Sequence, residues 1–508
     1  MKTDGIAVFD VGKTNKKVLI YGNDLTVLTR RVQRFDTEVI DGVELEPIEA
    51  IQEWFLRTLQ ELASEYAISA VAITTHGAAL VAIGEDGTPA CPVVSYTHQP
   101  ADETLHERFY ATVGSREELQ ERTATVELLP LINPAKLLYF CQQQWPERYA
   151  RIQHILFLPQ YFAYLLTGAI TVDNTYAGCH SYLWNYKTWS WDPQVVEALG
   201  LAGTLPGEPQ PSWQVAGSVA ATVSEQTGLG TDIPVTVGIH DSNASLLPHL
   251  LKRRGQEFVL NSTGTWCVAM HAVPTEEGQR REISFHQDEI GKSVFFNISA
   301  FGDPVKTTIL VGGLEYETYT TILSALHQTD TMPSFNRQLY ERIIRRADQF
   351  IIPGVLPGTG QFPHSRPRVI DGHQEYELAD IQSHAVIPPL FQDLPAAHAV
   401  LNLSIALQSR VALKRVGLRE GMELYTEGGF RHNEHYNKLL AAFFPESPVF
   451  LTNIDEATSL GAAITGLAAR DGASPQEYAD RFTIDRFRME QEPFGELHRY
   501  EVEFLKQV

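Results

Sequence analysis

The first residues of the chain with an evident chemical use are Asp10 and the polar run after it. Asp10 ends an apolar segment, and the next residues include Gly12-Lys13-Thr14-Asn15-Lys16-Lys17. Glycine lets a backbone approach an anion, and hydroxyl, amide and ammonium groups can donate hydrogen bonds to phosphate. Asp10 would face a divalent cation, because carboxylate oxygens are common ligands of Mg²⁺. The run therefore predicts a hairpin that holds phosphate and a metal ion.

The Gly-Lys-Thr at residues 12–14 also invites comparison with a nucleotide-binding P-loop. That pattern requires a glycine five residues before Gly12, where this chain has Ala7, and residues 6–9 have the pattern of a strand. We therefore exclude a P-loop. The alternative interpretation of the segment is an ordinary hairpin in which Asp10 and Asn15 only stabilise the turn.

Two later runs have a similar character. Asp241 follows the apolar segment 233–239 and His240, and ligands of open α/β sheets gather beyond the carboxyl ends of strands. Taken alone, Asp241 could instead cap the turn from strand to helix. The segment 258–260 leads into the hydroxyl-rich turn Asn261-Ser262-Thr263-Gly264-Thr265-Trp266. This recurrence predicts two similar halves, each with one phosphate-facing loop.

The elements that must position these side chains alternate between apolar strand-like runs and helical patterns, which predicts an α/β fold. The strand over 70–75 is expected to end at His76-Gly77. In chain order the sequence predicts a helix over 51–62 and a strand over 70–75, then two strands over 80–83 and 92–96 that form a hairpin around the polar turn 85–87. Helices over 133–168 ending at Gly168, and loops over 200–217 and 353–376, are expected to follow.

In the second half, residues 425–430 are expected to form a strand end and a glycine turn that lead into a helix. Its apolar face would comprise Tyr436, Leu439, Leu440, Phe443 and Phe444, and Pro445 would end it. Asn453 and Glu456 resemble a capping box before a further helix with an apolar stripe over 457–467.

Composition limits the class of protein. The 508 residues are 44% hydrophobic and 20% charged, which is typical of a globular chain with at least two domains. The four cysteines form no CxxC pair, so neither a disulfide framework nor a zinc site is expected. The net charge of −22 opposes binding to nucleic acid or anionic membranes. Without a leader or spanning segment in the sequence, we expect a cytoplasmic protein.

Together the motifs resemble those of the FGGY family of carbohydrate kinases, whose fold belongs to the actin-like ATPase superfamily. Residues 10–15 resemble the family's first phosphate motif and residues 262–266 its second. Gly238-Ile239-His240-Asp241 resembles the segment with its catalytic aspartate, and residues 428–433 its adenosine motif. Residues 456–463 continue the family pattern.

The resemblance implies two actin-like (ribonuclease H-like) α/β domains, 1–248 and 249–508, with an active-site cleft between them. It implies ATP and Mg²⁺ as cofactors, Asp241 as the catalytic base and Asp10 as the residue that helps to hold Mg²⁺. The implied ATP-binding residues are Gly12, Lys13, Thr14, Asn15, Lys17, Thr263, Gly264, Thr265, Gly428, Gly429 and Asn433. The implied substrate-binding residues are His76, Gly77, Tyr96, His240 and Asp241.

The substrate expected from the resemblance is a ketose. Residues 156–168 are similar to rhamnulokinases, residues 74–77 and 92–96 to fuculokinases, and His76-Gly77 also to xylulokinases. L-Rhamnulose and L-fuculose are the favoured substrates, with xylulose, ribulose or another pentulose as alternatives. An actin-like ATPase without sugar transfer, or a catalytically silent sugar-binding protein, are the remaining alternatives. The expected partner is a small sugar rather than nucleic acid or membrane, and family members often form homodimers.

Overall fold

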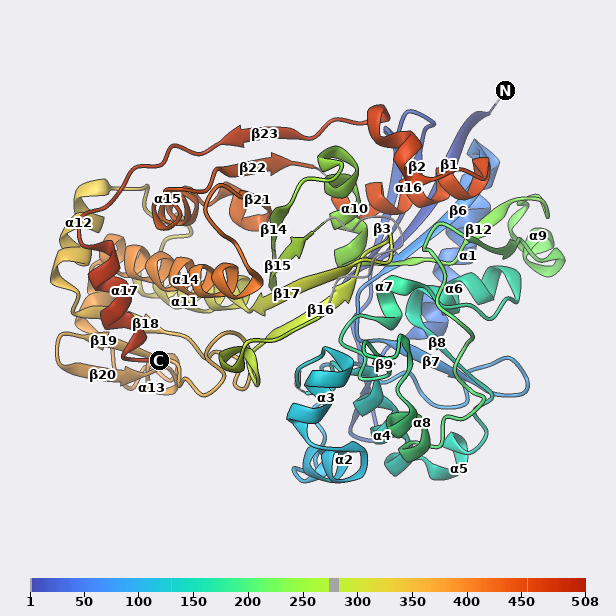
Figure 1. Cartoon of the computed structure of the whole chain (residues 1–508), viewed down its shortest axis with the longest axis horizontal. Helices are drawn as coiled ribbons and strands as arrows, with labels where there is room; N and C mark the ends of the chain where they lie inside the picture. The colour runs from blue at the N-terminus through green and yellow to red at the C-terminus, as the bar shows by residue number, and fades with distance from the viewer. Residues whose placement is uncertain (1, 129, 274–282, 455) are drawn as a thin grey trace.

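The computed structural model describes residues 2–128, 130–273, 283–454 and 456–508. Two seven-stranded sheets, each flanked by helices, form the two halves of the molecule (Figure 1). The first has the order β11-β12-β6-β1-β2-β3, with β13 also paired to β6, and the second has the order β16-β17-β15-β14-β21-β22-β23. The predicted two-domain α/β architecture is confirmed.

The first sheet brings three strand ends with polar residues together. Strands β1 and β2 form the predicted hairpin, with Asp10 opposite Lys17. Strand β6 pairs in parallel with both β1 and β13. The carboxyl ends of these three strands therefore lie at the same edge of the sheet. The strands of this sheet are β1 (Thr3–Val11), β2 (Asn15–Tyr21), β3 (Val27–Arg34), β6 (Tyr66–Thr75), β11 (Val215–Ser218), β12 (Pro234–Thr236) and β13 (Ile239–His240).

Helices cover both faces of the first sheet. On one face, α1 (Ile48–Glu65) and α6 (Leu158–Thr167) pack on β1, where the Phe9 ring stacks on Phe55 at 3.8 Å between centroids. On the other face lie α10 (Asp241–Arg253) and α16 (Ala457–Asp471). Figure 1 shows α16, drawn red, beside the blue strands β1, β2 and β6. A helix made late in the chain therefore completes the core of the first half.

The second sheet repeats the central arrangement of a hairpin beside a parallel strand. Strands β14 and β15 are antiparallel, and β21 runs parallel to β14 with Thr263 opposite Gly428. Helices α11, α14 and α15 pack on one face, while Leu246 of α10 packs on the other. The elements are β14 (Phe258–Thr263), β15 (Cys267–Ala272), β16 (Val294–Ile298), β17 (Pro304–Leu310), β21 (Glu423–Gly428), β22 (Val449–Asn453), β23 (Asp485–Arg488), α11 (Gly312–His327), α14 (Leu394–Val416) and α15 (Glu434–Phe443).

Helix α10 thus contacts the cores of both halves, and Asp241 is its first residue. The last strand of the first sheet ends at His240 and the first strand of the second sheet begins at Phe258, so the change of sheet lies close to the predicted domain boundary. Helix α16, late in the chain, nevertheless packs on the first sheet. The boundary at residue 248 stays a prediction.

A smaller lobe projects from the first half. Its helices and strands are β7 (Leu80–Ile83), α2 (Leu105–Val113), α3 (Arg116–Thr123), α4 (Pro134–Gln144), α5 (Pro146–Tyr149), β8 (His154–Phe157), α7 (Asn174–Ala177), β9 (Trp184–Asn185), β10 (Ser190–Trp191) and α8 (Pro193–Ala198). The remaining elements are β4 (Glu38–Ile40), β5 (Val43–Leu45), α9 (Ala221–Thr227), α12 (Arg337–Arg346), β18 (Gln349–Ile352), β19 (Arg368–Asp371), β20 (Gln374–Glu377), α13 (Leu378–Gln382) and α17 (Leu497–Leu505).

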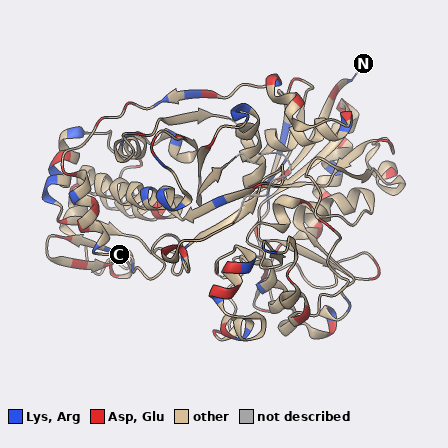
Figure 2. Ribbon diagram, in the orientation of Figure 1, with Lys and Arg blue, Asp and Glu red and all other residues tan. Residues whose placement is uncertain are grey.

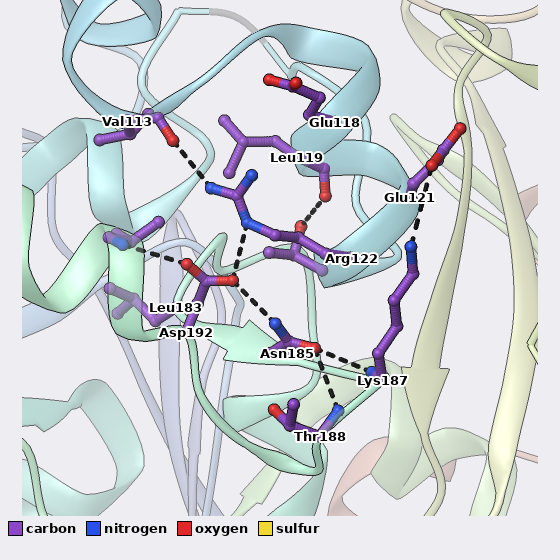
Figure 3. Close-up of polar contacts among 12 residues, drawn as sticks. Val113, Glu118, Leu119, Glu121, Arg122, Leu183, Asn185, Lys187, Thr188 and Asp192 are labelled. Carbon is purple, nitrogen blue, oxygen red and sulfur yellow. Dashed lines mark hydrogen bonds and ion pairs between the residues drawn. The ribbon is translucent and has the colours of Figure 1, made fainter.

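A buried ion pair ties this lobe together (Figure 3). Arg122 Nε lies 2.8 Å from Asp192 Oδ2, and Arg122 Nη2 donates to Val113 O at 2.7 Å. The same Asp192 oxygen accepts from Asn185 Nδ2 at 3.0 Å, while Asp192 Oδ1 accepts from Val195 N at the start of α8. Because Asp192 is fully buried and satisfied on both oxygens, it fixes α3, β9 and α8 relative to one another.

Several local expectations are wrong. Strand β7 pairs with β8 instead of with residues 92–96, which form no strand, and residues 154–157 of the expected helical region are the strand β8. The expected loop at 200–217 includes the start of β11, and the one at 353–376 contains β19 and most of β20.

The predicted capping box before α16 is also wrong. Asn453 ends β22, opposite Asp485 of β23, so it does not precede the helix. Glu456 is the N-cap residue, with a left-handed φ of 57°, and its side chain makes no capping hydrogen bond. Its carboxylate instead binds Lys17 and Arg30.

Charged residues of both signs are interspersed over both halves (Figure 2). The four cysteines are buried and unpaired in disulfides, as the sequence predicts. Among the described residues, none of the helices combines the length and the apolar character that crossing a bilayer requires.

Candidate active site

A cavity of about 300 Å³ lies between the two halves, where the carboxyl ends of the strands meet. His76 and Gly77 reach it from the end of β6, Asp241 from the start of α10, and residues 262–264 from the end of β14. The other lining residues are Ala78, Tyr96, Leu128, Ile132, Cys179, His180, His240, Ser242, Ser245, Trp266, Val268, Phe295, Asn297, Ile309 and Thr458. Side chains from both halves therefore face one cavity, in the cleft that the sequence predicts.

Asp10 is a buried carboxylate at the carboxyl end of β1. Its Oδ2 accepts a 2.8 Å hydrogen bond from Ser459 Oγ of α16 and lies 3.7 Å from Lys17 Nζ. Burial raises the pKa of Asp10 to about 6, although Lys17 and the Ser459 hydrogen bond oppose the shift, and the nearby carboxylates of Glu456 and Asp241 add to it. A bound cation would favour the ionised form, which is the form that could hold it.

Asp241 begins α10 and keeps about 34% of its side chain exposed to the cavity. Its Oδ1 accepts from Ser242 N at 2.6 Å. Burial raises the pKa of Asp241, while the hydrogen bonds from Ser242 act to lower it. The N-cap residue of the helix is His240, whose Nδ1 also accepts from Ser242 N at 3.2 Å. Asp241 therefore shares in the cap through Oδ1, and its catalytic role stays a prediction.

His76 and Tyr96 lie together on the first-half side of the cavity, with ring centroids 5.7 Å apart. His76 Nδ1 is 2.8 Å from Gly77 O. If Nδ1 donates to this carbonyl, Nε2 is left as an acceptor, since burial lowers the pKa of His76 and keeps the ring neutral. Glycine is required at residue 77, because a Cβ there would lie 2.5 Å from His240 Nε2.

Lys13 lies beside the cavity rather than at the tip of the first hairpin. Its ammonium forms an ion pair with Glu46, lies 2.5 Å from Ser95 Oγ and is 4.9 Å from the centroid of the Tyr96 ring. The structure therefore places Lys13 among residues of the predicted sugar side.

The other residues of the first hairpin divide between its two faces, as alternation in a strand requires. Lys17 faces Asp10 and Glu456. Lys16 is buried on the other face, where its ammonium donates to Lys13 O at 2.7 Å and burial lowers its pKa to about 8. Gly12 N donates to Asn15 O at 3.0 Å and closes the turn, which leaves Thr14 and Asn15 exposed at the tip.

A second cavity, of about 540 Å³, adjoins the first, because Gly264 lines both. The predicted nucleotide residues Gly429 and Asn433 line it. The remaining lining residues are mainly aromatic rings, histidines and a methionine, as expected for a nucleobase pocket. They are Gly313, Tyr316, Met332, Pro333, Ser334, Phe335, His398, Phe430, His432, Glu434 and His435.

The second phosphate motif and the adenosine motif are locked to each other. Thr263 Oγ1 donates to Glu427 O and accepts from Phe430 N at 3.0 Å. Gly428 has φ 78°, and a Cβ there would lie 1.9 Å from Thr263 O. The Thr263 hydroxyl is thus engaged within the protein, whereas Gly264 and Thr265 are exposed at the turn.

Asn433 has a structural role at the start of α15. Its Oδ1 accepts from Tyr436 N at 3.0 Å and caps α15, and its Nδ2 donates to Asn402 Oδ1 at 2.8 Å. A contact to nucleotide stays a prediction for this residue.

Sequence reasoning missed three groups around the cavities. Ser459 and Glu456 surround Asp10, Cys179 and His180 line the cleft cavity, and His398 and His435 line the second one. Only the adjacent Cys179-His180 pair carries a visible signal in the sequence. The others join the site through packing between distant segments.

Comparison with known protein families agrees with this geometry. Residues 6–248 match the N-terminal domain of the FGGY family of carbohydrate kinases. Residues 255–475 match the domain described as carbohydrate kinase FGGY, C-terminal domain.

Relatives with curated names are similar over part of the chain. A rhamnulokinase of Yersinia pestis (strain Pestoides F) is 26% identical over 276 residues, which is 52% of this chain and 53% of that protein. A probable L-xylulose kinase of Pasteurella multocida (strain Pm70) is 33% identical over 139 residues, 27% of this chain and 28% of that protein. The match with the rhamnulokinase thus spans about half of its length.

Solved structures share the fold along the whole chain. A carbohydrate kinase from Novosphingobium aromaticivorans has a TM-score of 0.77 at 24% identity, over 100% of this chain and 99% of the other. A ligand-bound xylulose kinase from Lactobacillus acidophilus has a TM-score of 0.77 at 15% identity, over 99% and 97% of the two chains.

Proposed function

The chain belongs to the FGGY family of carbohydrate kinases, and on that premise we propose that it transfers the γ-phosphate of ATP to a hydroxyl of a ketose. The observation that carries the proposal is the position of Asp241. Its carboxylate opens into a cavity lined by His76 and Tyr96 on one side and by the turn at residues 262–264 on the other. A sugar bound there would lie between a proton acceptor and a phosphate-binding turn.

In the proposed reaction, a sugar hydroxyl oxygen bonds to the γ-phosphorus while the bond from that phosphorus to the bridging oxygen of ADP breaks. The hydroxyl proton passes to Asp241. Because the transition state of phosphoryl transfer is loose, the base acts late and the protein mainly positions the reactants. The raised pKa of Asp241 suits a group that must accept a proton near neutral pH.

ATP is proposed to span the two adjoining cavities. The base would lie in the pocket of Gly429, Phe335 and Tyr316, and the β- and γ-phosphates would extend past Gly264 toward the first hairpin. Backbone at Gly264 and Thr265, with Thr14, Asn15 and Lys17 from the opposite half, would donate to phosphate oxygens. The engaged Thr263 hydroxyl supports a positioning role for that residue.

Asp10 is the residue that we propose to hold Mg²⁺, directly or through water. The donor set fits this ion, because Mg²⁺ sites with phosphate substrates combine one or two carboxylates with water and phosphate oxygens. When bound, the ion supplies positive charge that neutralises the phosphates. Ser459 orients the Asp10 carboxylate, and the buried environment of Asp10 strengthens its attraction to a cation.

The cavity lining supports an uncharged sugar as the substrate. Among the described residues no Lys or Arg lines it, so nothing there would pair with a carboxylate or phosphate on the sugar. Leu128, Ile132 and Phe295 give it an apolar wall that could receive the methyl group of a 6-deoxyketose. This wall favours L-rhamnulose or L-fuculose. The similarity to a probable L-xylulose kinase keeps pentuloses such as xylulose and ribulose as the second candidates.

The experiment that tests the proposal is a coupled ADP-release assay with Mg-ATP and a panel of ketoses. The panel contains L-rhamnulose, L-fuculose, L-ribulose, D-xylulose and L-xylulose, with D-gluconate as a charged comparison and a control without sugar. We expect strong stimulation by one neutral ketose. Hydrolysis of ATP that no sugar stimulates would instead support an actin-like ATPase, and sugar binding without ADP release would support a silent sugar-binding protein.

A further inference from the structure

Cys179, His180 and His240 meet in the wall of the cleft cavity. Cys179 Sγ and one ring nitrogen of each histidine lie within 4.8 Å of one another, and Cys179 Sγ is 3.5 Å from His240 Nε2. All three side chains are buried. Two of them follow α7 in the smaller lobe and the third belongs to β13 of the first sheet, so the fold alone creates the cluster.

Gly77 keeps the space in front of both imidazoles open. A Cβ at this position would lie 2.5 Å from His240 Nε2 and 2.9 Å from His180 Nε2. The two Nε2 atoms therefore lie next to the space that a side chain of residue 77 would otherwise fill. Because the three residues also line the cavity, a small ion can reach them from the cleft.

The protonation states of the cluster determine what a bound ion must displace. Burial lowers the pKa of both His180 and His240 to about 3, so each imidazole is neutral at physiological pH. Ligation through Nε2 of His240 requires the tautomer with its proton on Nδ1. Ser242 N then gives up its hydrogen bond to His240 Nδ1 and keeps the 2.6 Å hydrogen bond to Asp241 Oδ1. Burial, together with the charges of Asp241 and Asp173, raises the pKa of the Cys179 thiol well above its usual range. The thiol therefore carries a proton that a bound ion must displace.

We propose that Cys179 Sγ and the Nε2 atoms of His180 and His240 bind a Zn²⁺-like divalent ion, with a fourth position open to the cavity. Donor atoms of a tetrahedral zinc site lie about 3.5 Å apart, given bonds of about 2.0 to 2.3 Å. The spacing of Cys179 and His240 already meets this requirement, and His180 would complete the set by moving toward them. The thiolate and the two nitrogens each donate an electron pair to the ion, and the thiol proton passes to solvent.

A bound ion would also affect Asp241. His240 Nδ1 lies 3.4 Å from Asp241 Oδ1, and a metal-bound histidine commonly donates its other ring N–H to a carboxylate. The ion would occupy part of the cavity and draw Asp241 toward His240. On the proposed function, which this consequence requires, the ion and the sugar compete for the pocket, and micromolar Zn²⁺ inhibits transfer by raising the KM for sugar.

The direct test uses Co²⁺ as a spectroscopic probe on the full chain. We expect a sulfur-to-cobalt charge-transfer band that Zn²⁺ displaces, and calorimetry in two buffers should show release of about one proton per Zn²⁺. Cys179→Ser should abolish the band. His180→Asn should weaken Co²⁺ binding at least about tenfold, and asparagine tolerates the left-handed backbone of residue 180, which has φ 41°.

The matched control is Cys141→Ala, which removes another buried thiol and leaves the cluster intact. It should keep the band. The absence of a band in the folded wild type, or a band that persists in Cys179→Ser, would overturn the proposed site. The Co²⁺ and proton measurements do not depend on sugar transfer. If Co²⁺ and Zn²⁺ bind as expected but Zn²⁺ does not raise the KM for sugar, only the proposed inhibition is rejected. If no ketose stimulates ADP release, only the proposed function is rejected.

Discussion

Lys17 Nζ lies 2.5 Å from Glu456 Oε2, although the two residues are 439 positions apart in the sequence. The same ammonium is 3.7 Å from Asp10 Oδ2, and Arg30 approaches Glu456 at 2.7 Å. Two carboxylates therefore share the field of one lysine at the entrance to the first phosphate loop. The charge state of Asp10 depends on both of its neighbours.

Replacing either neighbour should move the acid limb of the pH–rate profile, and the two replacements should move it in opposite directions. Lys17 lowers the pKa of Asp10, which is about 6, and Glu456 raises it. If transfer requires ionised Asp10, activity falls as the pH drops through this pKa. The limb of kcat/KM should move to higher pH in Lys17→Met and to lower pH in Glu456→Gln.

The control for this pair is Lys187→Met, on a surface lysine whose side chain is 62% exposed. It should leave the limb in place. A limb that moves the same way in both cleft variants would contradict the assignment to Asp10. Asp241 also raises the pKa of Asp10, but it is untouched in both variants, so its effect is the same in each profile.

Asp241→Asn should separate catalysis from nucleotide binding. Loss of a general base lowers kcat by about 10² to 10⁴, while the nucleotide pocket around Gly429 and Phe335 is untouched. Ketose-stimulated ADP release measures the first effect and calorimetry with ADP the second. Turnover within a factor of about three of the wild type would reject Asp241 as the base.

Gly461→Ala should destabilise the protein. A Cβ at Gly461 would lie 1.9 Å from Ala244 O of α10, so the two helices could not keep their present separation. We expect the free energy of unfolding to fall by about 2 kcal/mol or more. Urea denaturation followed by circular dichroism measures it. Gly495→Ala is the matched control, because nothing lies within 4 Å of its added Cβ.

Lys136→Met should change how stability depends on pH. Lys136 is buried, and burial lowers its pKa from 10.5 to about 7. Between these values the unfolded chain holds a proton that the folded protein lacks, so the free energy of unfolding contributed by this residue rises with pH. Below pH 7 the folded state carries the full penalty of the buried charge.

The expected result is that Lys136→Met removes this rise. Near pH 6 the variant should have a higher free energy of unfolding than the wild type, by a few kcal/mol at most. Near pH 10 the two proteins should differ little. Denaturation at a series of pH values measures the difference, with Lys187→Met as the exposed control. A constant difference across the range would contradict the buried-charge explanation.

The convergence of Asp10, His76 and Asp241 was predictable because each lies at or just after the carboxyl end of an apolar strand, and the three strands are parallel in one sheet. Carboxyl ends of neighbouring parallel strands meet at one edge, so sequence order alone places their last residues together. The same holds for Thr263 and Gly428, which are opposite each other in β14 and β21.

The errors arise where a partner lies far away in the sequence. Strand β7 pairs with β8 across a long insertion rather than with the nearby residues 92–96, and a local pattern cannot reveal that choice. Glu456 resembles a capping residue from its spacing, yet the positive charges of Lys17 and Arg30 bind it instead.

Helix α16 has a consequence for the order in which the protein can be completed on the ribosome. Gly466 of this helix packs against Ile6 and Ala72, at the centre of a sheet translated hundreds of residues earlier. Until residues 457–471 leave the ribosome, the apolar face of the first sheet that α16 covers is exposed to solvent. We expect chaperones to bind the nascent chain at this surface. A fragment that stops near residue 248 should aggregate when made alone and should regain solubility when α16 is supplied with it.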